Sequence, residues 1–167
     1  MVSKVQNKIK NIKLVLTDVD GVLTDGGMYY SADGEYMKKF NTRDSMGMEL
    51  LLNYKIKTVL ITRENSKIVK KRVQKIQTVD LYSGVLDKKD LLPKILKKYN
   101  VKYDEIAYIG DDINDIDIMK SVGFSVTPSD GNYRVKKISD YICDLKGGEG
   151  AFREFADIIL KFIPKTY

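Results

Sequence analysis

The fold is decided by the stretch Ile12-Lys13-Leu14-Val15-Leu16-Thr17-Asp18-Val19-Asp20-Gly21. Four of its apolar residues, Ile12 and Leu14 to Leu16, lie within five positions, and two of the four are β-branched, which is typical of a strand buried on both faces, as in parallel sheets. Ligands of α/β proteins gather just beyond the carboxyl ends of such strands. Two carboxylates at this point, Asp18 and Asp20, indicate a bound cation, a phosphoryl acceptor or both, although aspartate is also common in turns and at helix caps.

The composition is that of a globular protein and excludes several kinds of chemistry. The chain has 167 residues, 43% hydrophobic and 31% charged, which predicts one domain, residues 1–167, with a sizeable core. Histidine is absent and Cys143 is the only cysteine, which excludes Ser-His or Cys-His catalysis, an internal disulfide and a Cys/His zinc site. Acid–base chemistry therefore falls to carboxylates, lysine or tyrosine, and a metal would be a hard cation such as Mg²⁺.

Charge and hydropathy argue against nucleic-acid and membrane partners. The formal net charge of +6 comes from lysines spread through predicted helices, without the accompanying aromatic residues of nucleic-acid-binding surfaces, so a small anionic substrate fits as well. No apolar run approaches the roughly 18 residues that a membrane span requires, and residues 1–8 contain no apolar signal core. We therefore expect a cytoplasmic protein that binds neither nucleic acid nor membranes.

Strands and helices alternate along most of the chain, which predicts an α/β fold with a doubly wound parallel sheet. After the first strand, apolar runs predict strands at 57–61, 79–82, 106–109, 123–126 and 140–143. Helical spacing of apolar residues predicts helices at 41–53, 66–75, 88–99 and 151–162, and a further helix that begins at Asn114.

The segment from Val22 to Phe40 predicts a β-hairpin that protrudes from the sheet. Two strands, 28–31 and 35–40, flank Ala32-Asp33-Gly34, and Asp-Gly is a strong hairpin-turn signal. Gly26-Gly27 at the base permits the ribbon to leave the sheet. The methionines and tyrosines on this ribbon indicate either a flap or a contact surface for another subunit.

Polar side chains follow three of the predicted strands where each strand ends: Asp18 and Asp20, then Thr62, then Asp111 and Asp112. Lys88 begins a helix between the second and third of these positions. Because the carboxyl ends of parallel strands meet at one edge of a sheet, we expect these side chains to converge. Carboxylates can hold Mg²⁺, while a hydroxyl, a lysine and backbone N–H groups can hold a phosphoryl dianion. Taken singly, Thr62 could cap a helix and Lys88 could be a surface lysine.

Together these segments resemble the four ordered motifs of the haloacid dehalogenase-like phosphatases: Asp18-Val19-Asp20-Gly21, Thr62, Lys88 and Gly110-Asp111-Asp112-Ile113-Asn114-Asp115. The resemblance covers nearly the whole chain and implies a Rossmann-like fold. It implies that Asp18 attacks phosphorus to form an aspartyl-phosphate, and that Asp20 protonates the leaving alcohol and then activates water. It also implies that Thr62 and Lys88 hold the phosphoryl oxygens.

The same resemblance implies a magnesium site. Mg²⁺ would bind Asp18, the backbone carbonyl of Asp20 and Asp111. Asp112 and Asp115 would orient these ligands or bind the ion through water. Considered alone, Asp115 could equally be an ordinary acidic residue at a helix N-terminus, where the helix dipole favours negative charge.

The spacing of the motifs leaves no room for the cap domain that most family members insert. Residues 21–61 hold only the hairpin and one helix, and residues 63–87 hold only a helix and a short strand. The chain therefore resembles the capless subgroup of 3-deoxy-D-manno-octulosonate 8-phosphate phosphatase, the nonulosonate 9-phosphate phosphatases and the C-terminal domain of some acylneuraminate cytidylyltransferases. The segments 24–26 and 147–154 support this similarity, which implies a homotetramer whose neighbouring subunits cover the active sites.

The subgroup implies a phosphorylated 2-keto-3-deoxy sugar acid as substrate, used in lipopolysaccharide or sialic-acid-type glycan synthesis. The carboxylate of such a sugar acid would require cations besides Lys88 in the site. Charged residues on helices are, however, commonly solvated. The candidate substrate-binding cations are Arg72, Lys75 and Arg153, with Arg63 and Arg43 beside them. Arg63 replaces a common glycine, and its backbone N–H remains available to the phosphate. Glu64, with Lys75, resembles the nine-carbon-acid members and favours a nine-carbon substrate.

Two other functions stay open at this point. A receiver-type phospho-acceptor domain uses a similar residue set, but there the lysine comes last, whereas here Gly110-Asp111-Asp112 follow Lys88. A non-catalytic oligomerisation domain, as in the cytidylyltransferase-fused relatives, would not need the complete set of motif residues that this chain retains.

Overall fold

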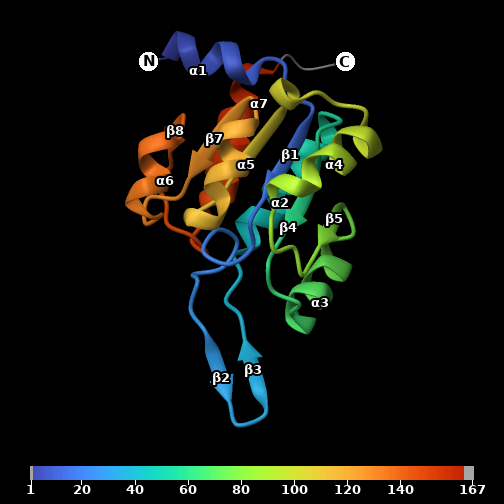
Figure 1. Ribbon diagram of the computed structural model, residues 1–167, viewed down its shortest axis with the longest axis vertical. Coiled ribbons are helices and arrows are strands. Elements are labelled where there is room, and N and C mark those ends of the chain that lie inside the picture. The colour runs from blue at the N-terminus through green and yellow to red at the C-terminus, as the bar shows by residue number, and fades with distance from the viewer. Residues whose placement is uncertain (1, 164–167) are drawn as a thin grey trace.

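The structure is a computed structural model that describes residues 2–163. Within them, six parallel strands form one sheet in the order β5-β4-β1-β6-β7-β8 (Figure 1). The strands are β1 (Leu14–Thr17), β4 (Lys57–Ile61), β5 (Val79–Tyr82), β6 (Ile106–Ile109), β7 (Phe124–Thr127) and β8 (Tyr141–Ile142). The first strand lies inside the sheet, with Leu14 opposite Lys57 of β4 on one side and Ile106 of β6 on the other.

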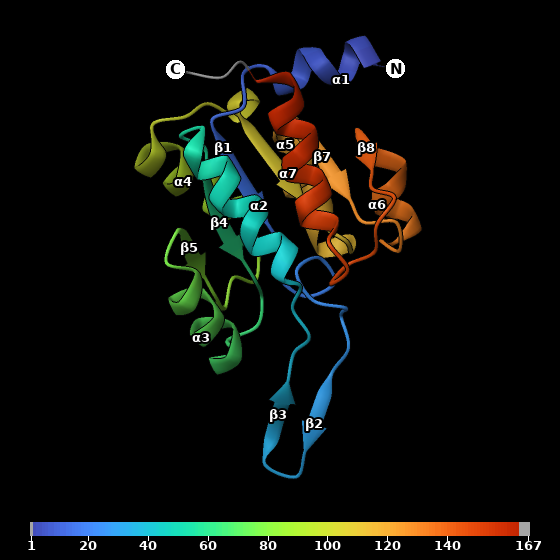
Figure 2. The same ribbon diagram turned by 180° about the vertical axis from the view of Figure 1, so that it is seen from behind.

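Helices cover both faces of this sheet (Figure 2). One face carries α2 (Thr42–Asn53), α3 (Lys67–Ile76) and α7 (Ala151–Phe162), and the other carries α4 (Leu92–Tyr99), α5 (Ile116–Ser121) and α6 (Tyr133–Ile138). The N-terminal helix α1 (Val2–Ile9) packs against α7 and β7. Short 3-10 helices, η1 (Lys89–Leu91), η2 (Tyr103–Glu105) and η3 (Ile113–Asp115), link strands and helices. The predicted doubly wound, Rossmann-like α/β fold is confirmed.

The apolar runs of the strands supply two cores because alternate residues of a strand point to opposite faces. Val15 and Leu60 pack among the helices of the first face. Leu14, Leu16 and Val59 pack among those of the second. Each such aliphatic side chain contributes about 1.5–3 kcal/mol when fully buried. Burial on both sides therefore holds the first strand inside the sheet, and its carboxyl end becomes the natural place for a site.

The predicted hairpin is present and projects beyond the edge of the sheet toward which β1 and β4 run (Figure 1). Its strands are β2 (Tyr29–Ser31) and β3 (Gly34–Met37), and they pair antiparallel across a tight turn. An antiparallel bridge between Thr24 and Phe40 closes the base of the ribbon. The ribbon exposes several large apolar side chains, which are Met28, Tyr30, Tyr36 and Met37.

The segments between the motifs contain no cap domain in the described part of the chain. Residues 21–61 form the hairpin, α2 and β4, and residues 63–87 form α3, β5 and loops, as the spacing predicts. No helix within residues 2–163 is both long and apolar enough to cross a membrane.

Some elements differ from the predictions. Two helices, α1 and α6, lie outside the predicted elements, because eight and six residues are too short for a clear apolar period. The helix predicted at 88–99 divides into η1 and α4, and Pro93, which lacks an N–H, stands in the first turn of α4. The second hairpin strand ends at Met37 rather than at residue 40.

Helices α2 and α7 are joined by a buried carboxylate. Gly150 caps α7 without a side chain, and Asp44 of α2 accepts the hydrogen bond from the Arg153 backbone N–H instead, at 2.9 Å. Asp44 is 3% exposed, and its Oδ2 has no hydrogen-bond partner among the described residues. Burial raises the pKa of Asp44 to about 6, against the opposing effects of the Arg153 backbone N–H and the Arg72 guanidinium.

We expect Asp44 to make the stability of the protein fall as the pH rises from about 4 to 6. Its folded pKa lies above the ordinary value, so the native state retains the proton and ionisation at higher pH favours unfolding. Asp44→Asn keeps the acceptor without the charge. Its free energy of unfolding, relative to that of the wild type, should therefore rise by about 2 kcal/mol when the pH is changed from 4.5 to 7.5. Urea unfolding at both pH values measures this gain.

Asp157→Asn is the matched control, because Asp157 is 52% exposed and pairs with Arg153 on the surface of α7. It should leave the pH dependence within a few tenths of a kcal/mol of the wild type, as most surface substitutions do. Parallel stability–pH curves for the wild type and Asp44→Asn would contradict the assigned burial effect.

Candidate active site

Loops at the carboxyl ends of β1, β4 and β6 bring the motif residues to one cavity. The carboxyl ends of β1 and β4 face the hairpin in Figure 1. The cavity has a volume of about 270 Å³, and its lining residues are Asp18, Asp20, Gly21, Gly26, Thr62, Arg63, Glu64, Asp111, Asp112 and Asn114. The convergence expected from the parallel topology is therefore observed for residues of the first, second and fourth motifs, and Lys88 of the third contacts Asp18 directly.

The most buried member of the cluster is Asp115, in η3, which is fully excluded from solvent. Its Oδ1 accepts hydrogen bonds from Lys88 Nζ at 2.7 Å and from the Tyr108 hydroxyl at 2.6 Å. Its Oδ2 accepts from the backbone N–H groups of Asp111 and Asp112 at 3.0 and 3.4 Å. A carboxylate offers about four lone-pair sites, so Asp115 has none left for a ligand.

Lys88 links Asp115 to the first motif. Its Nζ lies 2.7 Å from Asp115 Oδ1 and 2.7 Å from Asp18 Oδ2, and the side chain is 1% exposed. Burial alone would lower the pKa of Lys88, but the two carboxylates raise it above its ordinary value, so the ammonium stays charged. Removing one partner of such a buried pair costs about 3–5 kcal/mol.

Two carboxylates of the cluster keep acceptor capacity. Asp18 accepts from the Val19 backbone N–H at 2.6 Å, and burial with the nearby Asp115 raises its pKa, against the effect of Lys88. The Asp111 carboxylate accepts no hydrogen bond from another described residue, and burial, then Asp115, raise its pKa to about 7. A half-buried carboxylate without such a partner is unfavourable unless it is protonated or binds a cation.

The charge of the cluster matches a divalent cation. One carboxylate oxygen from each of Asp18, Asp111 and Asp115 lies within 4.8 Å of the other two. Three carboxylates and the Lys88 ammonium carry a net charge of −2 when ionised. The oxygen donors suit a hard cation such as Mg²⁺. Since Asp115 is saturated by donors, Asp18 and Asp111 are the side chains that can hold the ion.

Two glycines make room for these carboxylates. Gly21 has φ +83°, and a Cβ there would overlap the Asp111 carboxylate. A Cβ at Gly110 would lie 2.5 Å from the Asp115 carboxylate. Glycine at these positions therefore lets two backbone segments approach the acidic cluster closely.

Asp20 belongs to a second cluster, separate from the first. Its Oδ1 accepts from Lys38 Nζ at 2.6 Å, and its Oδ2 accepts from the Thr62 hydroxyl at 3.4 Å. Thr62 is buried and its Oγ1 also accepts from the Glu64 backbone N–H at 3.0 Å. Asp20 and Thr62 therefore meet across the cavity, as the motif positions predict.

Two contacting residues, Lys38 and Tyr108, are absent from the predicted site. Lys38 follows a strand of the hairpin, and in the sequence it is one lysine among many. Tyr108 lies in the apolar run of β6, where an aromatic residue indicates only core. Burial and Asp115 raise the pKa of Tyr108 well above its ordinary value, so it remains a hydrogen-bond donor. Pairing of a buried hydroxyl with a motif carboxylate depends on three-dimensional placement and has no local sequence signal.

The predicted substrate-binding residues divide into two groups. Arg63 and Glu64 line the cavity, whereas Arg72, Lys75 and Arg153 of this chain do not. The Arg72 guanidinium donates to Ser45 Oγ at 2.5 Å and stacks over Phe40. Arg153 pairs with Asp157 and shares a separate surface groove with Arg43.

Asp112 lies at the exposed side of the cavity. Its Oδ1 accepts from the Ile113 backbone N–H at 2.8 Å and from Asn132 Nδ2 at 3.0 Å, and it thereby caps η3 and ties this loop to the start of α6.

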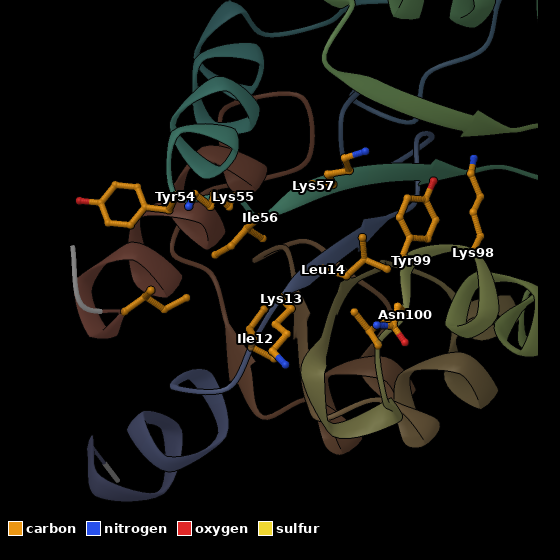
Figure 3. Close-up of a pocket in the computed structure, with 12 residues that line it drawn as sticks. Ile12, Lys13, Leu14, Tyr54, Lys55, Ile56, Lys57, Lys98, Tyr99 and Asn100 are labelled. Carbon is orange, nitrogen blue, oxygen red and sulfur yellow. The ribbon is translucent and has the colours of Figure 1, made fainter. Parts of the chain in front are cut away.

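A larger cavity, of about 480 Å³, lies near the amino ends of β1 and β4 (Figure 3). Lys13, Lys57 and Lys98 are among its lining residues, but Figure 3 shows their ammonium groups pointing in different directions. Lys13 pairs with Glu105 and Lys98 with Asp80. The side chains here do not converge on a common point, so the acidic cavity is the candidate active site.

Comparisons with known proteins place this site in a family context. A family described as haloacid dehalogenase-like hydrolase matches residues 28–154. The 3-deoxy-D-manno-octulosonate 8-phosphate phosphatase of Haemophilus influenzae is 37% identical over 156 residues, 93% of this chain and 87% of that protein.

Solved structures agree with these matches. The cobalt-bound form of the Haemophilus influenzae octulosonate phosphatase has a TM-score of 0.89, 37% identity, and matches 93% of this chain and 91% of its own. The Moraxella catarrhalis enzyme, solved with a magnesium ion, a phosphate ion and a KDO molecule, has a TM-score of 0.93 and 33% identity, over 98% of this chain and 94% of its own.

We expect Mg²⁺ to raise the thermal unfolding midpoint of the wild type, because a cation that binds only the native state stabilises it. At a concentration one hundred times Kd the gain is about 2.7 kcal/mol. Asp111→Asn should abolish most of this gain. Asp117→Asn, which changes an exposed carboxylate outside the cavity lining, should retain it. Differential scanning fluorimetry at constant ionic strength measures the shift, and a wild-type midpoint that ignores saturating MgCl₂ would contradict the site.

Proposed function

The chain belongs to the haloacid dehalogenase-like hydrolase family and is a phosphoric monoester hydrolase, and on that basis we propose that it hydrolyses 3-deoxy-D-manno-octulosonate 8-phosphate. The observation that carries this proposal is the buried Asp18–Lys88–Asp115 cluster at the cavity, in a chain 37% identical to a phosphatase named for that substrate. The reaction would serve lipopolysaccharide synthesis. Nine-carbon acid phosphates are the runner-up substrates.

The nine-carbon alternative depends on two residues. Glu64 lines the cavity, but Lys75, which supports the same alternative, is not among the lining residues of this chain. Two curated relatives that are 37% identical to this chain are named for the eight-carbon acid. We therefore favour the eight-carbon substrate and treat the nine-carbon acids as competitors in the test.

In the proposed reaction Asp18 is the nucleophile. The Val19 N–H and Lys88 fix its two oxygens, so the carboxylate presents a constant orientation. A bond forms between an Asp18 oxygen and phosphorus while the bond from phosphorus to the leaving oxygen breaks, which gives an aspartyl-phosphate. Lys88 and Thr62 would bind the phosphoryl oxygens and offset their negative charge.

Asp20 is the proposed acid and base. It gives a proton to the oxygen of the leaving alcohol, and then takes one from the water that attacks the aspartyl-phosphate. Its Oδ2 lies beside Thr62 at the cavity, which supports this role because Thr62 is a proposed phosphoryl-binding residue. The second attack releases inorganic phosphate and regenerates the Asp18 carboxylate.

Mg²⁺ is the cofactor, and the donor set fits it. Asp18, Asp111 and the backbone carbonyl of Asp20 would hold the ion, which when bound supplies positive charge against the phosphoryl oxygens. Asp115 orients Lys88 and the Asp111 backbone by its hydrogen bonds, and Asp112 holds the neighbouring loop.

Arg63 and Glu64 are the proposed contacts to the sugar acid, because they line the cavity beside the phosphoryl position. The Arg63 guanidinium can pair with a carboxylate or a phosphoryl oxygen. Roles for Arg72, Lys75 and Arg153 in substrate binding stay predictions, and they would require these side chains to act on another subunit or after a change of shape.

We expect the wild type to release phosphate from 3-deoxy-D-manno-octulosonate 8-phosphate with a higher kcat/KM than from KDN 9-phosphate or N-acylneuraminate 9-phosphate. A malachite-green phosphate assay with Mg²⁺ measures all three. Asp18→Asn should lower kcat by roughly 10³-fold or more, because it removes the nucleophile. Equal release from Asp18→Asn and the wild type would refute the assigned nucleophile, and a preference for a nine-carbon ester would transfer the proposal to that substrate.

We also propose that the chain forms one domain and assembles as a homotetramer through the hairpin. Both cores pack on the same sheet, which supports a single domain. Tyr36 is 72% and Met28 73% exposed, and apolar side chains gathered on a projecting ribbon favour a protein contact.

We expect the wild type to sediment as a tetramer, and Tyr30→Ser with Tyr36→Ser to sediment as a smaller species, because these changes remove apolar surface from the contact. Tyr103→Ser, which changes an exposed tyrosine far from the ribbon in sequence, should leave the assembly intact. A wild type that is monomeric at micromolar concentration in analytical ultracentrifugation would rule out the tetramer.

A further inference from the structure

Lys38, the first residue after β3, reaches from the hairpin into the catalytic region. Its Nζ lies 2.6 Å from Asp20 Oδ1 and 2.9 Å from Glu35 Oε1, and its side chain is 7% exposed. Glu35 in turn accepts a hydrogen bond from Ser66, which caps α3. A chain of contacts therefore runs from α3 through the ribbon to Asp20.

The contact that links Lys38 to the candidate site is its ion pair with Asp20. We therefore consider an effect of Lys38 on the reaction that acts through Asp20. Burial lowers the pKa of Lys38, but its hydrogen bonds to Asp20 and Glu35 raise it above the ordinary value, so the group stays a cation.

The contacts distinguish the two oxygens of Asp20. Lys38 occupies Oδ1, whereas Oδ2 faces Thr62, which lines the cavity. An aspartate with 29% side-chain exposure and no fixed partner could rotate among its staggered χ1 rotamers. The ammonium, itself held by Glu35, prevents this rotation and leaves one oxygen available on the cavity side.

We propose that Lys38 is a positioning residue for Asp20, which fixes the side chain so that its Oδ2 faces the leaving oxygen of the substrate. The inference rests on the proposed acid–base role of Asp20. It adds that a residue of the projecting hairpin, outside the four motifs, sets the rate of the reaction within the same subunit.

The test compares Lys38→Met, Lys38→Arg and Lys39→Met in steady-state assays of the Mg²⁺-loaded full chain. Lys38→Met should lower kcat by roughly 100-fold, the cost of a misplaced reacting group, with KM within about twofold of the wild type. Lys38→Arg should restore most of kcat, because it returns a cationic donor to Asp20. Lys39→Met is the matched control and should behave as the wild type, since Lys39 is 52% exposed and lies 3.9 Å from Glu149.

Asp20→Asn separates this inference from the proposed function. The double variant Lys38→Met/Asp20→Asn should be no slower than Asp20→Asn, because residues that act as one unit are not additive. If Asp20→Asn keeps the wild-type kcat, the proposed acid–base role fails. If Asp20→Asn is inactive and Lys38→Met keeps kcat, or raises KM alone, only the positioning role is overturned.

A second variant keeps the inference falsifiable if Lys38→Met fails to fold. Glu35→Gln removes the charge that holds Lys38 and leaves Lys38 in place. It should lower kcat by a smaller factor than Lys38→Met with KM unchanged, and its circular dichroism and unfolding midpoint should match the wild type. Unchanged kcat in Glu35→Gln, with Lys38→Met unfolded, overturns the positioning role.

Discussion

The structure depends on the buried contact between Asp115 and Lys88. Taking a carboxylate and an ammonium out of water is unfavourable unless every remaining polar site finds a partner. Asp115 meets that condition with donors from Tyr108, from Lys88 and from two backbone groups. These hydrogen bonds hold the ammonium beside Asp18 and leave Asp115 no free site for a ligand. The same contact therefore orients Asp18, the proposed nucleophile, and leaves Asp18 and Asp111 as the carboxylates that can bind a cation.

The two carboxylates of the first motif, to which we assign different roles in the proposed reaction, have different cationic partners. Asp18 pairs with Lys88 in the buried cluster, whereas Asp20 pairs with Lys38 at the base of the ribbon. Each ammonium holds one oxygen of its own carboxylate, so the two side chains are oriented by separate contacts. In the proposed reaction Asp18 would thereby be positioned for attack on phosphorus and Asp20 for proton exchange with the leaving group.

The sequence predicts the features that depend on the order of residues along the chain. It does not predict the side-chain contacts between residues that are distant in the chain. Buried strands followed by polar residues predict the sheet and the convergence at its carboxyl edge. The hairpin follows from its turn residues, although Lys38 on it has no distinguishing pattern. The helices α1 and α6 are too short to show a period. Helical cations such as Arg72 match an anionic substrate by charge alone. In the structure, however, the Arg72 guanidinium donates to Ser45 and lies over the Phe40 ring.

The absence of a cap between the motifs makes the hairpin the main element near the site. The cavity of about 270 Å³ lies just below the roughly 300–1,000 Å³ of typical ligand pockets, so the proposed sugar-acid substrate would extend beyond its lining. In the proposed tetramer another subunit would cover it through the apolar ribbon. Lys38 lies at the base of that same ribbon and contacts Asp20. In this proposal assembly and proton transfer would share one structural element, and a change in how the ribbons associate would reach Asp20, the proposed acid and base, through a single side chain.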